Sequence, residues 1–445
     1  MQNHPHYYPL SPSQKILMLA QTFTIEPKEV KESNVLNIYF YIRENCSLDA
    51  MEASLNYVLQ LHDSLRLRFV RRGLRTMQYI APYEYFTPER EQVADEAAFR
   101  EYLQHLRDIP VAMYNGNMVN ARILRVGESG GAMVIRFFHC CTDGYSHSLI
   151  YPELEYAYDE YAAGRTPEMP EQLYSIEDAF RENERYRKSE KHKEDLKFWY
   201  QMFRSQRNYS LPVGRRALHG TCGLETAHIT GDTYHKLYAA AKGNKSSMQS
   251  AVMLLDAVTF WALTGKDNFC FYTLYHGRNT PEMRKTVGCL MNTVPLFFDL
   301  DGSVPFVQAI AQTHTNYKQA LSHGLLPMND YLSAGYKESM RNGFNFNHGW
   351  ILVSLAKAGA AARKRKYEFA EVKTKTRPYQ FYQTMYDIEG EELTLMLDYQ
   401  LARFTREQAL KILNLLCSLI KLAADDPNIT LQELKDAGHK LAGNL

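Results

Sequence analysis

Residues 132–144 read AMVIRFFHCCTDG, and this stretch decides how the rest of the chain is interpreted. Its first half is an apolar run typical of a buried strand, and the run ends at His139. A short turn follows, and then Asp143 and Gly144. A strand that ends in this way can present an imidazole to a cleft, where it can take a proton from an amine, a hydroxyl or a thiol. Asp143 could orient the loop through an ion pair, and Gly144 could let a substrate approach the backbone closely.

The same residues allow other interpretations. His139 could be a hydrogen-bonded core residue, Asp143 and Gly144 a plain turn, and Cys140 and Cys141 packing residues. Histidine and cysteine are also zinc ligands, but consecutive cysteines in an extended segment point to opposite faces, and no second CxxC or HxxxH pair completes a ligand set. A cysteine nucleophile activated by His139 is sterically possible. We expect no metal site.

Two strand-like runs, at 119–126 and 132–139, flank Gly127–Gly131, which matches the pattern G-x-S-x-G. A nucleophile elbow needs a strand that enters a helix, whereas here a second strand leaves the turn. The pattern therefore predicts a hairpin with a glycine-rich turn. Further upstream, Val35–Arg43 alternates as a strand does, and we expect Asp49 to cap the helix that follows it.

A helical pattern over Ser148–Ala163 is broken at Gly164 and by two prolines that follow it. We place a lobe boundary there, which gives an N-terminal lobe of residues 1–170 and a C-terminal lobe of residues 171–445. The charged stretch from about Ile176 to Phe203 has apolar residues at helical intervals, which is typical of one bridging helix with a single buried stripe.

Strands and helices also mix in the second lobe, so the fold class is α/β or α+β in two lobes. The elements expected there are a strand near His228, helices that begin at Gly231 and at about Ser247, strands at Asn268–Tyr275, Val287–Leu300 and Asn342–Ser354, a helix over Val304–Ser322, a hairpin over Gln380–Tyr399 and a closing helix over Thr405–Ala424.

Composition narrows the classes of function. The 445 residues are 45% hydrophobic and 23% charged, with 51 Lys and Arg against 50 Asp and Glu. Because the positive and negative charges nearly cancel, the chain has no net positive electrostatic potential to hold nucleic acid or an anionic membrane. We expect neither as a partner. The seven cysteines are odd in number and lie mostly in apolar runs, so no disulfide framework is indicated. The start of the chain lacks the pattern of a signal peptide, and we expect a cytoplasmic protein.

Several short segments, in collinear order, are similar to the motifs of one family. They are Tyr8–Gln14 (YPLSPSQ), His62–Phe69 (HDSLRLRF), Phe138–Gly144 (FHCCTDG), Tyr156–Ala162 (YAYDEYA), Asp195–Trp199 (DLKFW), His276–Arg278 (HGR) and Val287–Leu296 (VGCLMNTVPL). Over nearly its whole length the chain resembles a condensation domain of nonribosomal peptide synthetases, in the chloramphenicol-acetyltransferase-like superfamily. The third segment occupies the family's HHxxxDG motif, with Phe138 in place of the first histidine. The family's late Arg-Asp-x-Ser-Arg-Asn-Pro-Leu segment is not recognisable.

The resemblance implies a pseudo-dimer of two related lobes that form a V with a central tunnel, and it places His139 at the middle of that tunnel. His139 matches the second histidine of the motif, which deprotonates or positions the nucleophile. Asp143 matches a structural aspartate that pairs with an arginine, for which Arg66 and Arg278 are both candidates. Gly144 matches the glycine whose backbone lies near the reacting carbonyl. The resemblance also suggests four residues that line the tunnel: Phe138, Cys140, Asn292 and Gly277.

The activity that the resemblance implies is amide formation between a carrier-bound acyl thioester and an amine acceptor. The substrates would arrive on the phosphopantetheine arms of acyl or peptidyl carrier proteins, and the acceptor would be a small amine or an aminoacyl group. The chain would act on these carriers in trans or be a piece of an assembly line. The chain would need no cofactor of its own and would work as a monomer. The basic run Arg363–Lys366 could dock an acidic carrier-protein helix or the phosphopantetheine phosphate, but such a run is more often a solvated basic loop.

Two alternatives stay open from the sequence. One is an O- or N-acyltransferase of the same superfamily that uses acyl-CoA or an acyl carrier as donor. The other is a catalytically silent condensation-like module that docks a partner, which the phenylalanine at position 138 keeps open.

Overall fold

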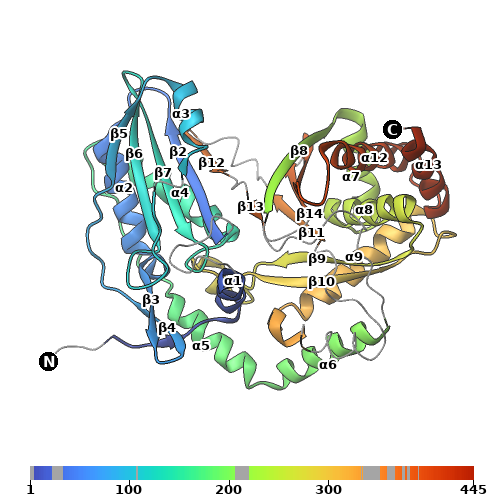
Figure 1. The fold of residues 1–445 in the computed structure, drawn as a ribbon, viewed down its shortest axis with the longest axis horizontal. Coiled ribbons are helices and arrows are strands. Elements are labelled where there is room, and N and C mark those ends of the chain that lie inside the picture. The colour runs from blue at the N-terminus through green and yellow to red at the C-terminus, as the bar shows by residue number, and fades with distance from the viewer. Residues whose placement is uncertain are drawn as a thin grey trace. The chain divides into compact units, whose positions relative to one another are not determined.

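The computed structural model describes residues 5–22, 34–106, 109–205, 220–331, 333, 351–357, 366–372, 376–377, 381–388 and 390–444. The chain forms two compact units, each assembled from segments that are remote in the sequence (Figure 1). The first unit comprises Met1–Ser189, His276–Met291 and Arg365–Thr374. The second comprises Glu190–Tyr275, Asn292–Lys364 and Lys375–Leu445.

The first unit is built on a five-stranded sheet whose order is β12-β2-β7-β6-β5. Its strands are β2 (Val35–Ile42), β5 (Glu89–Val93), β6 (Val119–Val126), β7 (Gly130–Phe138) and β12 (Glu368–Val372). Neighbouring strands are antiparallel except β5 and β6, which are parallel. Figure 1 shows β12, which comes from late in the chain, beside β2 at the edge of the sheet.

Every residue of β2 and β7 is buried, because apolar side chains pack on both faces of the sheet. One core cluster includes apolar residues of α2 (Leu48–Leu61) and α4 (Gly144–Ala162), which pack against each other. A smaller cluster around Phe99, from α3 (Glu96–Tyr102), covers the other face. The main sheet is therefore a rigid platform, and β7 ends on it at Phe138.

The first unit also has a small sheet of order β1-β4-β3, made of β1 (Tyr8–Pro9), β3 (Leu67–Arg72) and β4 (Arg75–Ile80). Helix α1 (Pro12–Thr22), the short 3-10 helix η2 (Asp63–Arg66) and helix α5 (Ile176–Arg187) complete its labelled elements, apart from a second 3-10 turn, η4 (Met283–Lys285).

The second unit has a seven-stranded sheet of order β10-β9-β11-β14-β15-β8-β13. The strands are β8 (Gly220–Thr230), β9 (Asn268–Tyr275), β10 (Asn292–Asp299), β11 (Ile351–Lys357), β13 (Thr376–Arg377), β14 (Phe381–Ile388) and β15 (Glu392–Gln400). The helices are α6 (Glu190–Ser205), α7 (Gly231–Gly243), α8 (Met248–Thr264), α9 (Phe306–Ser322), α12 (Arg406–Asp425) and α13 (Leu431–Asn444). Helix α8 is apolar on all sides because it packs against α7, α9, α12 and α13.

The mixed class of helix and sheet is confirmed, and so are the hairpin of β6 and β7, the hairpin of β14 and β15, and helix α8. The V-shaped arrangement of the lobes, the tunnel and the boundary between residues 170 and 171 stay predictions. Residues 342–350 of one expected strand, and residues 363–365 of the basic run, lie outside the described residues.

Three expectations about helices were wrong. Ser47, not Asp49, caps α2, because the Ser47 side chain accepts a hydrogen bond from the backbone N–H of Ala50. The stretch 176–203 is not one helix: α5 ends at Arg187 and α6 begins at Glu190. Ser189 donates its hydroxyl proton to the backbone carbonyl of Tyr186, in the last turn of α5.

The third difference bears directly on the site. Helix α4 begins at Gly144 rather than Ser148, and Asp143 is its N-cap. The carboxylate of Asp143 accepts a hydrogen bond from the backbone N–H of Ser146, which satisfies one of the free donors of the first turn. The motif is therefore the junction at which a buried strand passes into a capped helix.

Candidate active site

The loop of residues 139–143 joins β7 to α4, and its backbone is tied down at both ends. The N–H of Phe138 donates to the carbonyl of Met118 over 2.7 Å, and the N–H of His139 donates to the carbonyl of Asn34 over 2.8 Å. The N–H of Cys141 donates to the carbonyl of Phe138 over 2.9 Å, which closes the turn. These bonds hold the start of the loop in one place relative to the main sheet.

His139 has a defined tautomer. Its Nδ1 lies 2.9 Å from the carbonyl oxygen of Thr142, and a carbonyl oxygen can only accept a hydrogen bond. The proton of the neutral imidazole is therefore on Nδ1, and Nε2 carries the lone pair. The side chain is partly exposed, in contrast to its buried neighbours on both sides. This is the arrangement that a general base requires: an oriented ring with an available nitrogen.

Asp143 and Arg278 form a buried, bidentate ion pair within the first unit. Nη1 of Arg278 lies 2.9 Å from Oδ2 of Asp143, and Nη2 lies 3.0 Å from Oδ1. Both side chains are inaccessible to solvent, at 0% and 1% exposure. Of the two arginines proposed from the sequence, Arg278 is the one that the structure places on Asp143.

The remaining hydrogen-bonding capacity of this pair is used by neighbouring groups. Arg278 also donates to the carbonyls of Thr286 and Gly288 and to the hydroxyl of Ser146. The Asp143 carboxylate accepts, besides its bonds from Ser146, the backbone N–H groups of Leu290 and Met291, over 3.0 and 3.1 Å. A buried ion pair persists when its other polar atoms are satisfied in this way.

The electrostatics of Asp143 follow from these contacts. Burial by itself would raise the pKa of its carboxyl, but the charge and hydrogen bonds of Arg278 outweigh burial and hold the pKa below its usual value. Asp143 is therefore a fixed anion rather than a proton donor. Its structural effect is to fasten the first turn of α4 to the segment His276–Met291.

Gly277 allows Arg278 to reach Asp143. Its φ is +69°, and a Cβ at this position would lie 1.8 Å from the carbonyl oxygen of Leu290. A side chain is excluded by both the backbone conformation and the contact. The structure thus gives Gly277 a packing role, and its predicted place in a tunnel lining stays a prediction.

Gly144 differs from Gly277. It is exposed, and a Cβ built on it would meet no atom of the described residues within 4 Å. It is also the first residue of α4, where the helix dipole favours negative charge. Open space beside a helix N-terminus, next to the loop that carries His139, can receive a group that develops negative charge.

Two other predicted residues, Arg66 and Asn292, lie elsewhere. Arg66 donates its guanidinium protons to the backbone carbonyls of Leu59, Gln60 and Ala81, so it braces the end of α2. Asn292 lies at the start of β10 in the second unit, where it donates to the carbonyls of Gly324 and Leu326. A role of Asn292 in a tunnel lining stays a prediction.

Phe138 and Cys140 are buried in the core of the first unit. The ring of Phe138 contacts that of Phe69 edge-on at 5.9 Å, and Cys140 has no exposed surface. Burial raises the pKa of the Cys140 thiol well above its usual value, and it raises that of Cys141 to about 12. Neither cysteine can supply a thiolate at neutral pH, so the structure removes the cysteine nucleophile considered above.

Two residues of the site were missed. Ser146 bridges three groups, because its hydroxyl bonds to Asp143, Arg278 and the Gly288 backbone. Its place three residues after Asp143 is the spacing of a helix cap and could have indicated this role. The second is His147, in the first turn of α4, which is 4% exposed and packs beside Phe137. Its Nε2 has no hydrogen-bond partner among the residues that the structure describes.

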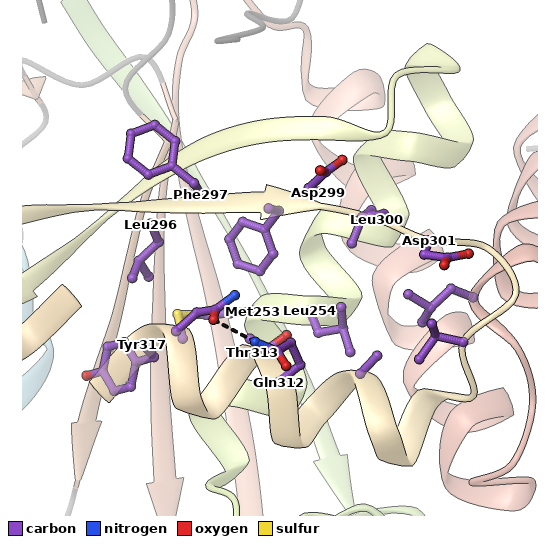
Figure 2. Close-up of a pocket in the computed structure, with 15 residues that line it drawn as sticks. Met253, Leu254, Leu296, Phe297, Asp299, Leu300, Asp301, Gln312, Thr313 and Tyr317 are labelled. Carbon is purple, nitrogen blue, oxygen red and sulfur yellow. Dashed lines mark hydrogen bonds between the residues drawn. The ribbon is translucent and has the colours of Figure 1, made fainter. Parts of the chain in front are cut away.

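Other binding features are few in the part of the chain that the structure describes. No cluster of three or more His, Cys, Asp or Glu is arranged to hold a metal ion there. No described helix is long and apolar enough to cross a membrane. A cavity of about 180 Å³ lies in the second unit among α8, β10 and α9 (Figure 2). Its lining includes Leu254, Leu296 and Leu300.

Comparison with known proteins identifies the family. The profile of the family described as "Condensation domain" matches residues 4–440, which is nearly the whole chain. The chain belongs to the condensation domain family. Condensation domains are amide-bond-forming acyltransferases of nonribosomal peptide synthesis.

Curated relatives of this condensation domain are much longer proteins. It is 22% identical to bacitracin synthase 1 of Bacillus licheniformis over 434 residues, which cover 96% of this chain and 8% of that protein. It is 23% identical to a linear gramicidin synthase polypeptide of Brevibacillus parabrevis over 291 residues, which cover 63% of this chain and 6% of that protein. The chain thus spans a small fraction of the length of the curated relatives that it matches.

Solved structures share the fold. The starter condensation domain of rhizomide synthetase, in complex with C8-CoA and Leu-SNAC, has a TM-score of 0.81 and 18% identity, with 96% of each chain covered. SgcC5 from Streptomyces globisporus has a TM-score of 0.78 and 18% identity, with 95% of this chain and all of that chain covered. The first condensation domain of the calcium-dependent antibiotic synthetase has a TM-score of 0.78 and 15% identity. The chloramphenicol-acetyltransferase-like fold is therefore confirmed.

Proposed function

We propose that this condensation domain transfers an acyl group from a carrier-protein thioester to an amine and forms an amide. The observation that carries the proposal is the state of His139: a partly exposed imidazole, oriented by the Thr142 carbonyl, with the lone pair on Nε2. The loop that holds it matches the family's motif, and the family profile covers the chain.

In the proposed reaction the amine nitrogen attacks the thioester carbonyl. A C–N bond forms, the C–S bond breaks, and the phosphopantetheine thiol leaves on the donor carrier. Nε2 of His139 takes the proton that the amine loses, or holds the amine in line for attack. Gly144 at the start of α4 lies beside the carbonyl oxygen, where the helix dipole opposes the charge that develops on it. Much of the rate gain comes from holding the two reactants together.

Asp143, Arg278 and Ser146 act as positioning residues in this proposal. They touch each other rather than the reacting atoms, and they fix the first turn of α4 beside the His139 loop. Phe138 does the same for the other end of the loop by packing against Phe69, so the first histidine of the motif is replaced by an apolar anchor.

The test is intact-mass detection of acyl transfer. Purified protein is offered acyl groups on carrier proteins, on CoA and on N-acetylcysteamine, with amine and alcohol acceptors. We expect an amide from a carrier-bound donor, and we expect His139→Ala to lose a factor of about 10² to 10⁴ in rate. His105→Ala, an exposed histidine outside the loop, is the matched control and should keep full rate. Turnover that survives in folded His139→Ala would remove His139 from the mechanism.

A second donor class has a specific observation in its favour. The rhizomide starter condensation domain, which shares the fold, is described in complex with C8-CoA. The same panel decides this point, because product from acyl-CoA without any carrier protein would identify a CoA-dependent acyltransferase. Carrier binding without any product would instead identify a silent docking module.

A further inference from the structure

The hairpin of β3 and β4 ends in an unusual surface on the first unit. Strand β3 ends at Arg72, Gly73 and Leu74 form a two-residue turn, and β4 begins at Arg75. Gly73 has a φ of +61°, as a tight hairpin turn requires at this position. Arg71, Arg72, Leu74 and Arg75 are all exposed, and we call these four residues the basic hairpin tip.

Two features of the basic hairpin tip are unfavourable for the isolated chain. Arg72 lies directly opposite Arg75 in the strand register, and like charges at opposed positions destabilise a hairpin. Leu74 is fully exposed, at 107% of its reference surface, in a turn where a polar residue would be tolerated without cost. Features that cost stability without supporting the fold are expected where a surface binds a partner.

The three arginines are also available for binding. Among the residues that the structure describes, none of them forms an ion pair with a carboxylate. Arg71 instead lies over the ring of Tyr114 at 5.0 Å, and Arg72 lies over the ring of Tyr7 at 4.2 Å. Stacking on an aromatic ring uses the flat face of a guanidinium and restricts its motion, while its N–H donors at the edge can still bind carboxylates in pairs.

We propose that the basic hairpin tip docks the acidic surface of a carrier protein, with Leu74 packing among apolar side chains between its carboxylates. The proposal rests on the proposed function, which requires such a partner. The size of the tip favours a protein: sequence-independent binding to nucleic acid uses about 6 to 10 phosphate contacts. Basic segments that recognise lipid headgroups carry about 4 to 8 Lys and Arg. Three arginines are fewer than either kind of surface uses. Three arginines around one leucine instead resemble a small protein–protein interface, which has an apolar centre and a charged rim.

The experiment compares two ways of presenting one acyl group. The donor is either a purified acyl carrier protein with a loaded phosphopantetheine arm or the same acyl group on N-acetylcysteamine. For the double variant Arg72→Glu and Arg75→Glu we expect kcat/KM with the carrier-bound donor to fall about tenfold or more. The value with the small thioester should not change, because the tip is outside the catalytic loop. The double variant Lys421→Glu and Lys440→Glu, with the same change in net charge at exposed sites on α12 and α13, is the control.

Further measurements keep the outcomes distinct. Titration calorimetry with the carrier protein should show the same loss of affinity. Added salt should lower the affinity of the parent protein for the carrier until it approaches that of the variant. Arg75→Glu alone places a glutamate opposite Arg72, so this variant should fold at least as well as the parent and still bind the carrier less tightly. Leu74→Ser should weaken binding with little dependence on salt.

Unchanged carrier affinity and unchanged kcat/KM in the charge-reversed variant would overturn the docking proposal and leave the proposed function intact. Absence of turnover with every donor would overturn the proposed function, and calorimetry would still decide the docking proposal. Tip-dependent binding to phosphatidylglycerol vesicles or to duplex DNA, with none to the carrier protein, would assign the tip to another class of partner and overturn the proposal.

Discussion

At the scale of single residues, a substitution at Gly144 can distinguish a catalytic role of this glycine from a structural one, because the two roles predict different effects on activity and stability. The protein has room for a methyl group there, and alanine at the first position of α4 should stabilise the folded state by about 0.4 to 1 kcal/mol. If the reacting carbonyl approaches this backbone, the same methyl group will obstruct it. We expect Gly144→Ala to raise the melting temperature slightly and to lower kcat, as measured by thermal unfolding and by the mass assay. Full activity in this variant would place the carbonyl elsewhere.

The burial of His147 leads to a prediction about how the stability of the protein depends on pH. Burial lowers the pKa of its imidazole, while Glu371 and Asp143 oppose this and His139 adds to it. The unfolded chain, with a histidine pKa of about 6.5, then binds more protons than the folded protein. His147 therefore contributes stability that is present above pH 6.5 or so and is lost as pH falls toward its folded pKa. His147→Leu should lose less stability than the parent between pH 7 and pH 5, measured by urea unfolding. Parallel losses in the two proteins would contradict this.

The residues of the candidate site were easier to locate from the sequence than the partners that hold them. His139 and Asp143 stand in a motif, and a local pattern is enough to find them. The choice between Arg66 and Arg278 depends on which arginine the fold brings to Asp143, and Arg278 is 135 residues away in the chain. The burial of His147 likewise follows from its packing against Phe137. The helical pattern predicted from the sequence begins at Ser148, whereas α4 begins at Gly144, so the pattern did not include His147.

At the scale of elements, the ion pair of Asp143 and Arg278 joins α4 to the segment His276–Met291. Arg278→Ala would leave a buried carboxylate without its counter-charge, which typically costs about 3 to 5 kcal/mol. We expect this loss in the free energy of unfolding, measured with urea. The double variant Arg278→Ala and Asp143→Ala should be less destabilised than the sum of the two single variants, because it removes the orphaned charge. Additive losses would mean that the two residues act independently.

Elements with a strong local pattern were predictable, and elements defined by distant partners were not. The buried strands β2 and β7 and the wholly apolar helix α8 are visible in composition alone. Strand β12 is a strand because it pairs with β2, more than 300 residues earlier, and nothing in its own sequence states this. The division between α5 and α6 at Lys188 and Ser189 was missed because the charged helical pattern continues through it.

At the scale of the whole molecule, the first unit is completed by segments that come late in the chain. Segment Arg365–Thr374 supplies β12. The first residue of β12, Glu368, accepts hydrogen bonds from Tyr39, Arg43 and Arg100. Segment His276–Met291 supplies Arg278. A contiguous N-terminal piece therefore lacks both the edge strand of its sheet and the partner of its buried aspartate.

This arrangement predicts how a fragment of residues 1–189 behaves. Without β12 the backbone of β2 becomes an unpaired sheet edge, and without His276–Met291 the Asp143 carboxylate loses Arg278 and the backbone N–H groups of Leu290 and Met291. We expect the fragment to be aggregation-prone and to unfold without a cooperative transition, as judged by circular dichroism during heating, whereas the full chain unfolds cooperatively. The same fragment with Asp143→Asn removes the unpaired charge but not the open edge, so it should recover structure only in part. A sharp transition in the unmodified fragment would show that residues 1–189 are sufficient for the fold of the first unit, and that neither late segment is required to form it.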